Sequence, residues 1–133
     1  KYDVRIMDSM KDADIVMLHA HNDDFGDDLM IDELLDYRAN SVHWWDKGTT
    51  LNLSRAKAEL SNRFCLAGGL DHKKTMLSTP QEVETEVREA INAAAKGGGF
   101  ILGPGCTLSE KTPKANMTTA INAARKYGKH PRS

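Results

Sequence analysis

Residues 97–108 read GGGFILGPGCTL. The glycines at 97–99 stop a helical pattern that comes before them, and the apolar run over 99–105 predicts a short strand. Cys106 is expected just past the carboxyl end of that strand. A phosphate-binding loop would follow a strand and open a helix, whereas this glycine run precedes its strand. We therefore interpret it as a helix stop and a turn.

Three more apolar runs precede this one along the chain. They predict strands over residues 14–21, 40–45 and 63–70, and β-branched or aromatic residues mark the first two most clearly. Each strand is followed by a helical pattern, and an opening helix comes before the first strand. The apolar helical positions are Ile6, Met7 and Met10 in the opening helix, Phe25, Leu29, Met30, Leu34 and Tyr37 after the first strand, and Leu53, Ala56 and Leu60 after the second.

Start signals mark the last two helices. Thr79 can cap the first of these, Pro80 stands at its first helical position, and Glu82 completes a capping box. Thr112 and Pro113 repeat the cap and the proline before the last helix. Each helical pattern ends at a glycine, as helices commonly do.

The sequence therefore predicts an α/β fold in which four parallel strands alternate with helices. Two architectures fit this order. One is a doubly wound open sheet with helices on both faces, and the other is part of an eight-stranded barrel with helices on one face only. The pattern alone does not decide between them.

The composition excludes several classes of function. The chain has 133 residues, of which 40% are hydrophobic and 28% charged, and its net charge of -1 argues against a broad basic face for nucleic acid. No apolar run reaches the roughly 18 residues of a membrane span, and the first residues lack the apolar core of a signal peptide. Two cysteines, Cys65 and Cys106, make no disulfide framework. We expect a cytoplasmic protein in which Cys65 is a small buried residue.

Six segments in the right order carry a resemblance to a known family. They resemble the second half of the uroporphyrinogen decarboxylase superfamily, which also holds the zinc- and corrinoid-linked methyltransferases. The resemblance implies that residues 1–133 form a single partial domain, the C-terminal half of a TIM (β/α)8 barrel. The segments are VMLHAHN (16–22), ELLDYRANSVHWWD (33–46), NRFCLAGGLDHKKTML (62–77), TPQEVETEVREAI (79–91), GGGFILGPGCTL (97–108) and TPKANMTTAINAARKYGKH (112–130).

The chain departs from the decarboxylase pattern after its last strand. The decarboxylases of the family carry a Gly-His pair there, whereas this chain has Gly105 and Cys106. A cysteine at this position resembles the pattern of the methyltransferase branch, where a His-x-Cys pair and a later Cys hold zinc. Here the first pair is His19-x-His21, so one thiolate would be replaced by an imidazole.

Barrel enzymes carry their chemistry at the carboxyl ends of the strands. His19 and His21 end the first strand and, two residues apart, point to the same face. Together with Cys106 they could bind Zn²⁺ and leave one tetrahedral position open, as a catalytic site needs. The alternative is that the two imidazoles only hydrogen-bond water or a substrate carboxylate.

Other candidate site residues are expected at the same carboxyl ends of the strands. Asn22 could orient the histidines, although an Asn-Asp-Asp run is also typical of a turn or helix cap. Asp71 could orient a ligand or an imidazole, and we assign it, like Asn22, a catalytic role. His43, Trp45 and His72 are assigned to substrate binding, with core packing as the equal alternative for Trp45.

Three functions remain open at this point. The leading hypothesis is zinc-dependent methyl transfer from a corrinoid to a thiol, with a small-molecule substrate and a corrinoid protein as partners. The second is decarboxylation of a porphyrinogen without metal, in which His19 and His21 contact substrate carboxylates. The third is a non-catalytic fragment that associates with itself.

A half barrel leaves one face of its sheet uncovered, because parallel strands are normally covered on both faces. We expect Leu18, Val42 and Ile101 to be at risk of exposure there. An exposed apolar face is an association surface. The sequence therefore predicts a homodimer through the open half-barrel face.

Overall fold

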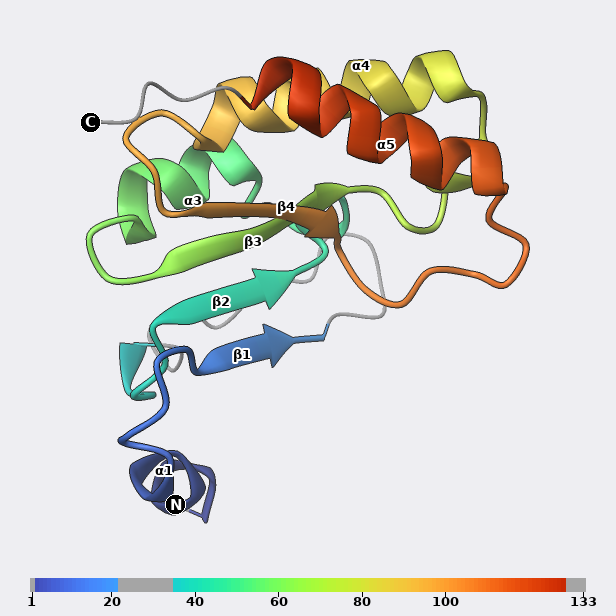
Figure 1. Cartoon of the computed structure of the whole chain (residues 1–133). Coiled ribbons are helices and arrows are strands. Elements are labelled where there is room, and N and C mark those ends of the chain that lie inside the picture. Colours follow the sequence, from blue (N-terminus) through green and yellow to red (C-terminus); the bar gives the residue numbers. More distant parts are fainter. Residues whose placement is uncertain (1, 22–34, 129–133) are drawn as a thin grey trace.

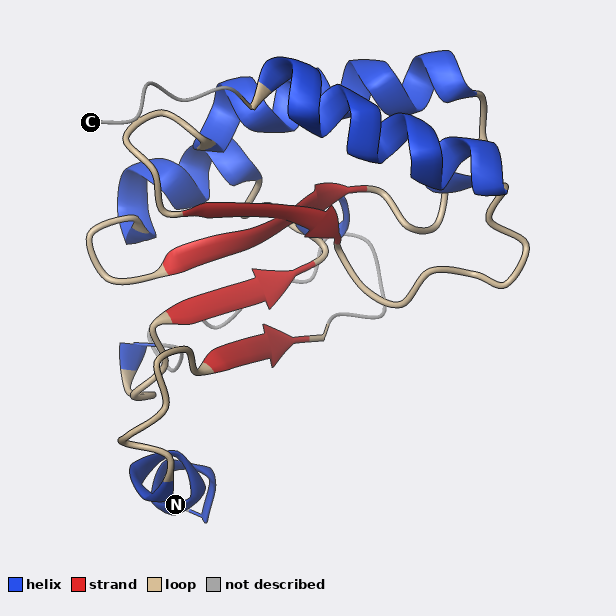
Figure 2. Ribbon diagram, viewed as in Figure 1, coloured by secondary structure: helices blue, strands red, loops and turns tan. Residues whose placement is uncertain are grey.

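The computed structural model describes residues 2–21 and 35–128. Four parallel strands form one sheet in the order β1-β2-β3-β4. Helices α3, α4 and α5, which follow β2, β3 and β4 in turn, lie together on one side of this sheet (Figures 1 and 2). The elements are α1 (Tyr2–Ser9), β1 (Met17–Ala20), β2 (Ser41–Trp44), η1 (Asp46–Gly48), α3 (Leu53–Leu60), β3 (Cys65–Leu70), η2 (Thr75–Leu77), α4 (Pro80–Ala94), β4 (Phe100–Pro104) and α5 (Lys114–Tyr127).

This arrangement confirms the predicted α/β fold of four parallel strands alternating with helices, and it is consistent with part of an eight-stranded barrel. The opening helix is also confirmed. Each strand is two to four residues shorter than predicted, because the flanking residues lie outside the sheet. Most of the helical pattern predicted after the first strand, from Phe25 to Leu34, lies outside the described residues.

The start of α4 follows the predicted capping box. The Thr79 hydroxyl accepts a hydrogen bond from the Glu82 backbone N–H at 3.3 Å, and the Glu82 carboxylate accepts one from the Thr79 N–H at 3.1 Å. Pro80 occupies the first helical position, where no N–H is needed. Two of the helix's otherwise unpaired N–H groups are thus satisfied.

The start of α5 differs from the prediction. Pro113 itself stands at the N-cap, and the helix begins at Lys114 without a side-chain cap. The Thr112 hydroxyl is buried and has no hydrogen-bond partner among the residues that the structure describes. The prediction that Thr112 caps this helix was wrong, because the chain enters the helix one residue later than the sequence pattern suggested.

The core lies between the sheet and the helices. Val42, Trp44 and Leu66 are at most 1% exposed and face α3 and α4. The expectation that Val42 and Leu18 lie on the uncovered face was wrong, since Leu18 also packs against this cluster. Alternation along a strand explains the error: Leu18 and Val42 directly precede His19 and His43, which face the other way.

A second cluster lies between the carboxyl half of β3 and the helix pair α4 and α5. It consists of the buried residues Leu70, Met76, Val83, Val87, Ala120 and Ala123. The two clusters together anchor the sheet to α3, α4 and α5. The carboxyl ends of the strands and the loops after them are thereby held in place.

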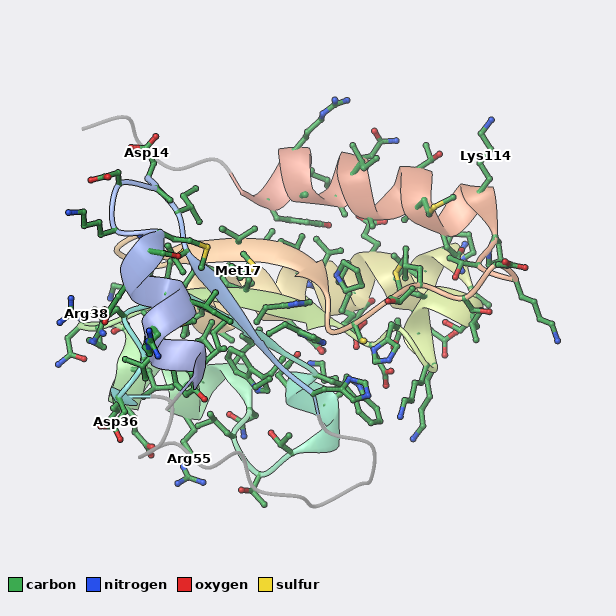
Figure 3. All side chains as sticks on the ribbon, turned by 90° about the horizontal axis from the view of Figure 1, so that it is seen from below. Asp14, Met17, Asp36, Arg38, Arg55 and Lys114 are labelled. Atoms are coloured by element: carbon green, nitrogen blue, oxygen red, sulfur yellow. The ribbon has the colours of Figure 1, made fainter. Side chains whose placement is uncertain are left out.

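The uncovered face of the sheet carries exposed apolar side chains. Met17 of β1 is 44% exposed and Ile101 of β4 is 43% exposed, and Met17 stands off β1 in Figure 3. Charged side chains such as Arg38 and Lys114 point outward at the periphery (Figure 3). The homodimer predicted through this face stays a prediction, which sedimentation of the full chain would test. Within the described part of the chain no helix is long and apolar enough to cross a bilayer, and the cytoplasmic location also stays a prediction.

β3 lies close to α4 at Gly69. A Cβ built on Gly69 would lie 2.8 Å from the Ala90 Cβ and 3.1 Å from Leu53 Cδ1. Its φ of +102° also falls where side chains are strained. Helix and strand can therefore pack at this distance only with glycine in the strand.

We expect Gly69→Ala to lower the free energy of unfolding by roughly 2–4 kcal/mol, because overpacking and the positive φ both cost energy. The matched control is Gly97→Ala, where φ is +78° but no atom lies within 4 Å of the added Cβ. That variant should lose only about 1 kcal/mol. Urea unfolding measures both, and equal losses would contradict the close-packing argument.

Candidate metal centre

Two of the three central side chains come from the end of β1. His19 lies in the strand, and His21 follows directly after its last residue. The Nδ1–H of His19 donates a hydrogen bond to the His43 carbonyl oxygen at 3.2 Å. Because a carbonyl can only accept, this bond selects the tautomer in which Nε2 of His19 carries the lone pair.

The third side chain comes from the loop after β4. Cys106 Sγ lies 3.7 Å from His19 Nε2 and 3.8 Å from His21 Nδ1. The three donor atoms all lie within 4.8 Å of one another. Around a tetrahedral zinc, with bonds of about 2.3 Å to sulfur and 2.0–2.1 Å to nitrogen, such atoms would be roughly 3.6 Å apart. The cluster therefore has the dimensions of a metal site.

Burial and charge also favour the neutral form of His19. Although the residue is largely exposed, partial burial of its ring lowers the pKa of His19, nearby His43 and His21 lower it further, and the backbone bond to His43 raises it. A neutral imidazole is the form that binds a metal. The His19 Nε2 lone pair that faces Cys106 is thus available at neutral pH.

The loop that carries Cys106 is held against Trp45. Gly105 is buried, and a Cβ built on it would lie 2.7 Å from the Trp45 Cα. Its N–H donates to the Leu70 carbonyl oxygen at 2.9 Å. Trp45, predicted to bind substrate, is 2% exposed and packs against this loop.

Asp71 and His72 follow β3 at the same end of the sheet. Asp71 Oδ1 accepts hydrogen bonds from the Lys73 and Lys74 N–H groups at 2.9 and 3.1 Å, which shapes the turn after the strand. The His72 ring meets the Trp45 ring edge-on, with centroids 5.3 Å apart. Burial lowers the pKa of His72, while Asp71 opposes this.

The predicted site residues are thus partly brought together. His19, His21 and Cys106 converge, with His43 beside them and Trp45 and His72 on the next two strand ends. Cys65 begins β3 at the opposite end of the sheet, as predicted, and is partly rather than fully buried. Asn22 lies outside the described residues. The catalytic role of Asp71 and the substrate-binding roles stay predictions.

Comparison with known proteins adds the family. A sequence model described as "Uroporphyrinogen decarboxylase (URO-D)" matches residues 1–127. The chain belongs to the URO-D family. The chain is 28% identical over 103 residues to a uroporphyrinogen decarboxylase of Herminiimonas arsenicoxydans, covering 74% of this chain and 27% of that protein. It is 27% identical over 86 residues to one of Methylibium petroleiphilum, covering 62% and 23%. The chain thus spans about a quarter of the length of these curated relatives.

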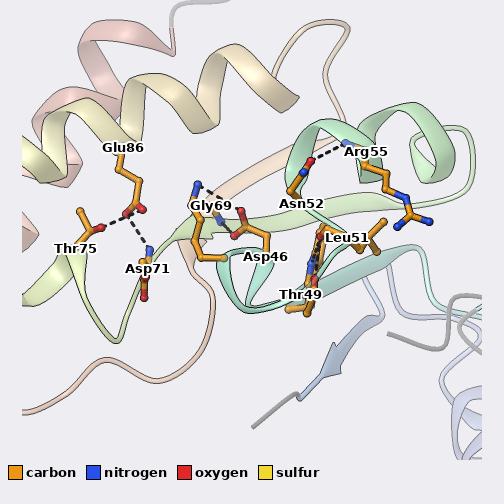
Figure 4. A network of polar contacts seen from close by, with 11 residues as sticks. Asp46, Thr49, Leu51, Asn52, Arg55, Gly69, Asp71, Thr75 and Glu86 are labelled. Atoms are coloured by element: carbon orange, nitrogen blue, oxygen red, sulfur yellow. Dashed lines mark hydrogen bonds and ion pairs between the residues drawn. The ribbon is translucent and has the colours of Figure 1, made fainter. Parts of the chain in front are cut away.

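The sequence analysis did not identify the structural role of two buried carboxylates in this URO-D family chain. Asp46 is 2% exposed and its Oδ1 accepts a hydrogen bond from the Gly69 N–H at 3.1 Å. Glu86 is 8% exposed and accepts from the Asp71 N–H at 2.9 Å and the Thr75 hydroxyl at 3.1 Å (Figure 4). The available signal was the position of Glu86 within the apolar face of α4, three residues after Val83 and four before Ala90.

Glu86 ties the turn after β3 to α4, and its burial raises the pKa of its carboxyl above the ordinary 4.5. The folded protein then holds this proton more tightly than the unfolded chain does. The free energy of unfolding should therefore fall as the pH rises from 4.5 through the raised pKa. Glu86→Gln removes this titration, so its stability should fall less than that of the wild type across the same window, as measured by urea unfolding at several pH values.

The matched control is Glu84→Gln on the same helix. Hydrogen bonds from Lys126 and Tyr127 lower the pKa of Glu84, an exposed carboxyl. Its contribution to stability is lost as the pH falls below 4.5 through the lowered pKa, so this variant should change the profile in the opposite sense. Parallel profiles for Glu86→Gln and the wild type would show that the Glu86 carboxyl titrates normally.

Proposed function

We propose that this chain forms part of a URO-D family enzyme that binds zinc through His19, His21 and Cys106 and transfers a methyl group to a thiol. One observation carries the proposal: the Cys106 thiol sulfur lies within 3.8 Å of two imidazole nitrogens, those of His19 and His21, which are 87 and 85 residues earlier in the chain. Two imidazoles and one thiolate suit zinc better than calcium or magnesium, which prefer oxygen ligands.

The arrangement also suits a catalytic centre. Three protein ligands leave one coordination position for a substrate, whereas structural zinc sites use four. His19 and His21 are exposed and Cys106 is partly exposed, so a small molecule can reach the three donor atoms. The centre lies at the carboxyl ends of the strands, where barrel enzymes carry their active sites.

A zinc ion held there would lower the pKa of a substrate thiol, so that the nucleophilic thiolate is present at neutral pH. His19, His21 and Cys106 would fix its place, and the His43 carbonyl would keep the His19 ring oriented. In the transfer, a sulfur–carbon bond forms while the bond between the methyl group and its donor breaks, and the electron pair of that bond stays with the donor. The thiol proton leaves to solvent. A corrinoid, carried on a partner protein, is the donor that the family resemblance suggests.

A second candidate is decarboxylation of a porphyrinogen without metal. The names of the relatives favour it, since each of those compared is called a uroporphyrinogen decarboxylase. In that reaction His19 and His21 would bind substrate carboxylates. The Cys106 thiol beside both imidazoles is the feature that this alternative leaves without a role.

The test is the zinc content of the full chain, purified without a metal-affinity tag. Elemental analysis should find close to one zinc per chain, and a His21→Ala/Cys106→Ala variant should lose it. Cys65→Ala is the matched control, because Cys65 begins β3 at the opposite end of the sheet, and it should keep the zinc.

Absence of zinc from well-folded wild-type protein would overturn the metal centre. Where zinc is found, removing it with a chelator distinguishes the two reactions. Release of carbon dioxide from a porphyrinogen at an unchanged rate after stripping would establish the second candidate. Methyl transfer to a thiol that disappears on stripping and returns with added zinc would establish the first.

A further inference from the structure

The donor atoms of the metal centre come from opposite edges of the sheet. β1 and β4 are the outer strands of the four. Neighbouring strands lie about 4.8 Å apart, so the edges of a flat sheet of this size would be roughly 14 Å apart. Yet Cys106 Sγ lies 3.7 Å from His19 Nε2, and the segment after β4 dips toward the ends of β1 and β2 (Figure 1). The packing of Gly105 against Trp45 holds part of this segment, and a second contact joins it to β2.

His43, in β2, makes such a contact on the uncovered face. Its Nε2–H donates a hydrogen bond to the Pro104 carbonyl oxygen at 2.7 Å. Pro104 is the last residue of β4 and stands two positions before Cys106. The bond is short and partly buried, and it joins β2 directly to the end of β4.

The strand between them leaves room for this bond. Ala67 of β3 is in register with His43 on one side and Ile101 on the other. Residues in register on parallel strands point to the same face, so β3 presents only a methyl group beside the imidazole. A larger residue at this position would occupy the space that the His43 ring crosses.

The same residue also orients the His19 ring. The His43 carbonyl oxygen accepts the hydrogen bond from His19 Nδ1 at 3.2 Å, and the two rings lie 4.6 Å apart. His43 thus contacts both the His19 ring and the end of β4 that leads to Cys106. Its backbone selects the tautomer of His19, and its side chain fixes the strand end that leads to Cys106.

We propose that His43 is a positioning residue of the metal centre, whose Nε2–H to Pro104 hydrogen bond sets the distance between Cys106 and the two histidines. This inference rests on the proposed zinc site. It replaces direct substrate binding as the role of the His43 Nε2 atom, because that atom is committed to a backbone carbonyl.

The decisive comparison is between His43→Gln and His43→Asn in the full chain. A glutamine amide places its N–H₂ group about where histidine places Nε2, whereas asparagine carries the same amide one methylene short of Pro104. Zinc affinity, measured by competition with a chromophoric chelator, should be largely retained in His43→Gln. It should fall about 10–100-fold in His43→Asn, the usual loss when a residue that holds a metal ligand is removed.

A spectroscopic measurement reports the geometry itself. With cobalt(II) in place of zinc, thiolate-to-cobalt absorption requires Cys106 within bonding distance. That band should be present in the wild type and His43→Gln and weakened in His43→Asn. Ser41→Ala is the matched control, because Ser41 on the same strand also donates to a backbone carbonyl, that of Cys65 at 3.0 Å, but at the opposite end of the sheet.

Equal zinc affinity and equal cobalt spectra in the wild type and His43→Asn would overturn the inference and leave the metal centre intact. A loss in Ser41→Ala as large as in His43→Asn would also overturn it, since any weakening of β2 would then suffice. If the folded wild type itself binds neither metal, the metal centre fails and the role of His43 fails with it. Loss in His43→Asn alone would establish the role.

Discussion

Parallel pairing of β1 to β4 is the constraint on which the rest of the structure depends. Because all four strands run the same way, their carboxyl ends and the loops after them meet at one end of the sheet. His21, Asp46, Asp71 and Cys106 each follow the end of a different strand. Residues that are far apart in the chain are therefore neighbours there, although each belongs to a different βα unit.

The two sides of this sheet are built on different principles. The side under α3, α4 and α5 is tightly packed, and Gly69 lets β3 approach α4. Its buried carboxylates Asp46 and Glu86 hold backbone N–H groups just where β3 ends, and the desolvation that raises their pKa values is the cost of that anchoring. The other side is open and carries the imidazoles. Rigidity on one side thus supports a centre that remains accessible on the other.

Much of this could be predicted from local sequence. The capping box of α4 and the alternation of strands with helices need only neighbouring residues, and two histidines spaced by one residue in an extended segment share a face. The start of α5 could not be predicted in the same way, since a Thr-Pro pair fits a cap at either residue. The face of Leu18 could have been predicted, because a strand residue next to His19 points to the opposite face. The sequence analysis instead grouped Leu18 with the apolar strand residues expected on the uncovered face. The bond from His43 to Pro104 depends on sheet curvature and on the small size of Ala67, which no local pattern encodes.

The separation of the ligands along the chain has a thermodynamic consequence. A metal held by His19, His21 and Cys106 would join points 85 and 87 residues apart and so act as a cross-link around β1 to β4. Closing a loop of that length restricts the unfolded chain far more than it restricts the folded one. Ions that bind only the folded state also draw the folding equilibrium toward it by mass action. The same three side chains would therefore make the folding of this sheet depend on the free metal concentration around it.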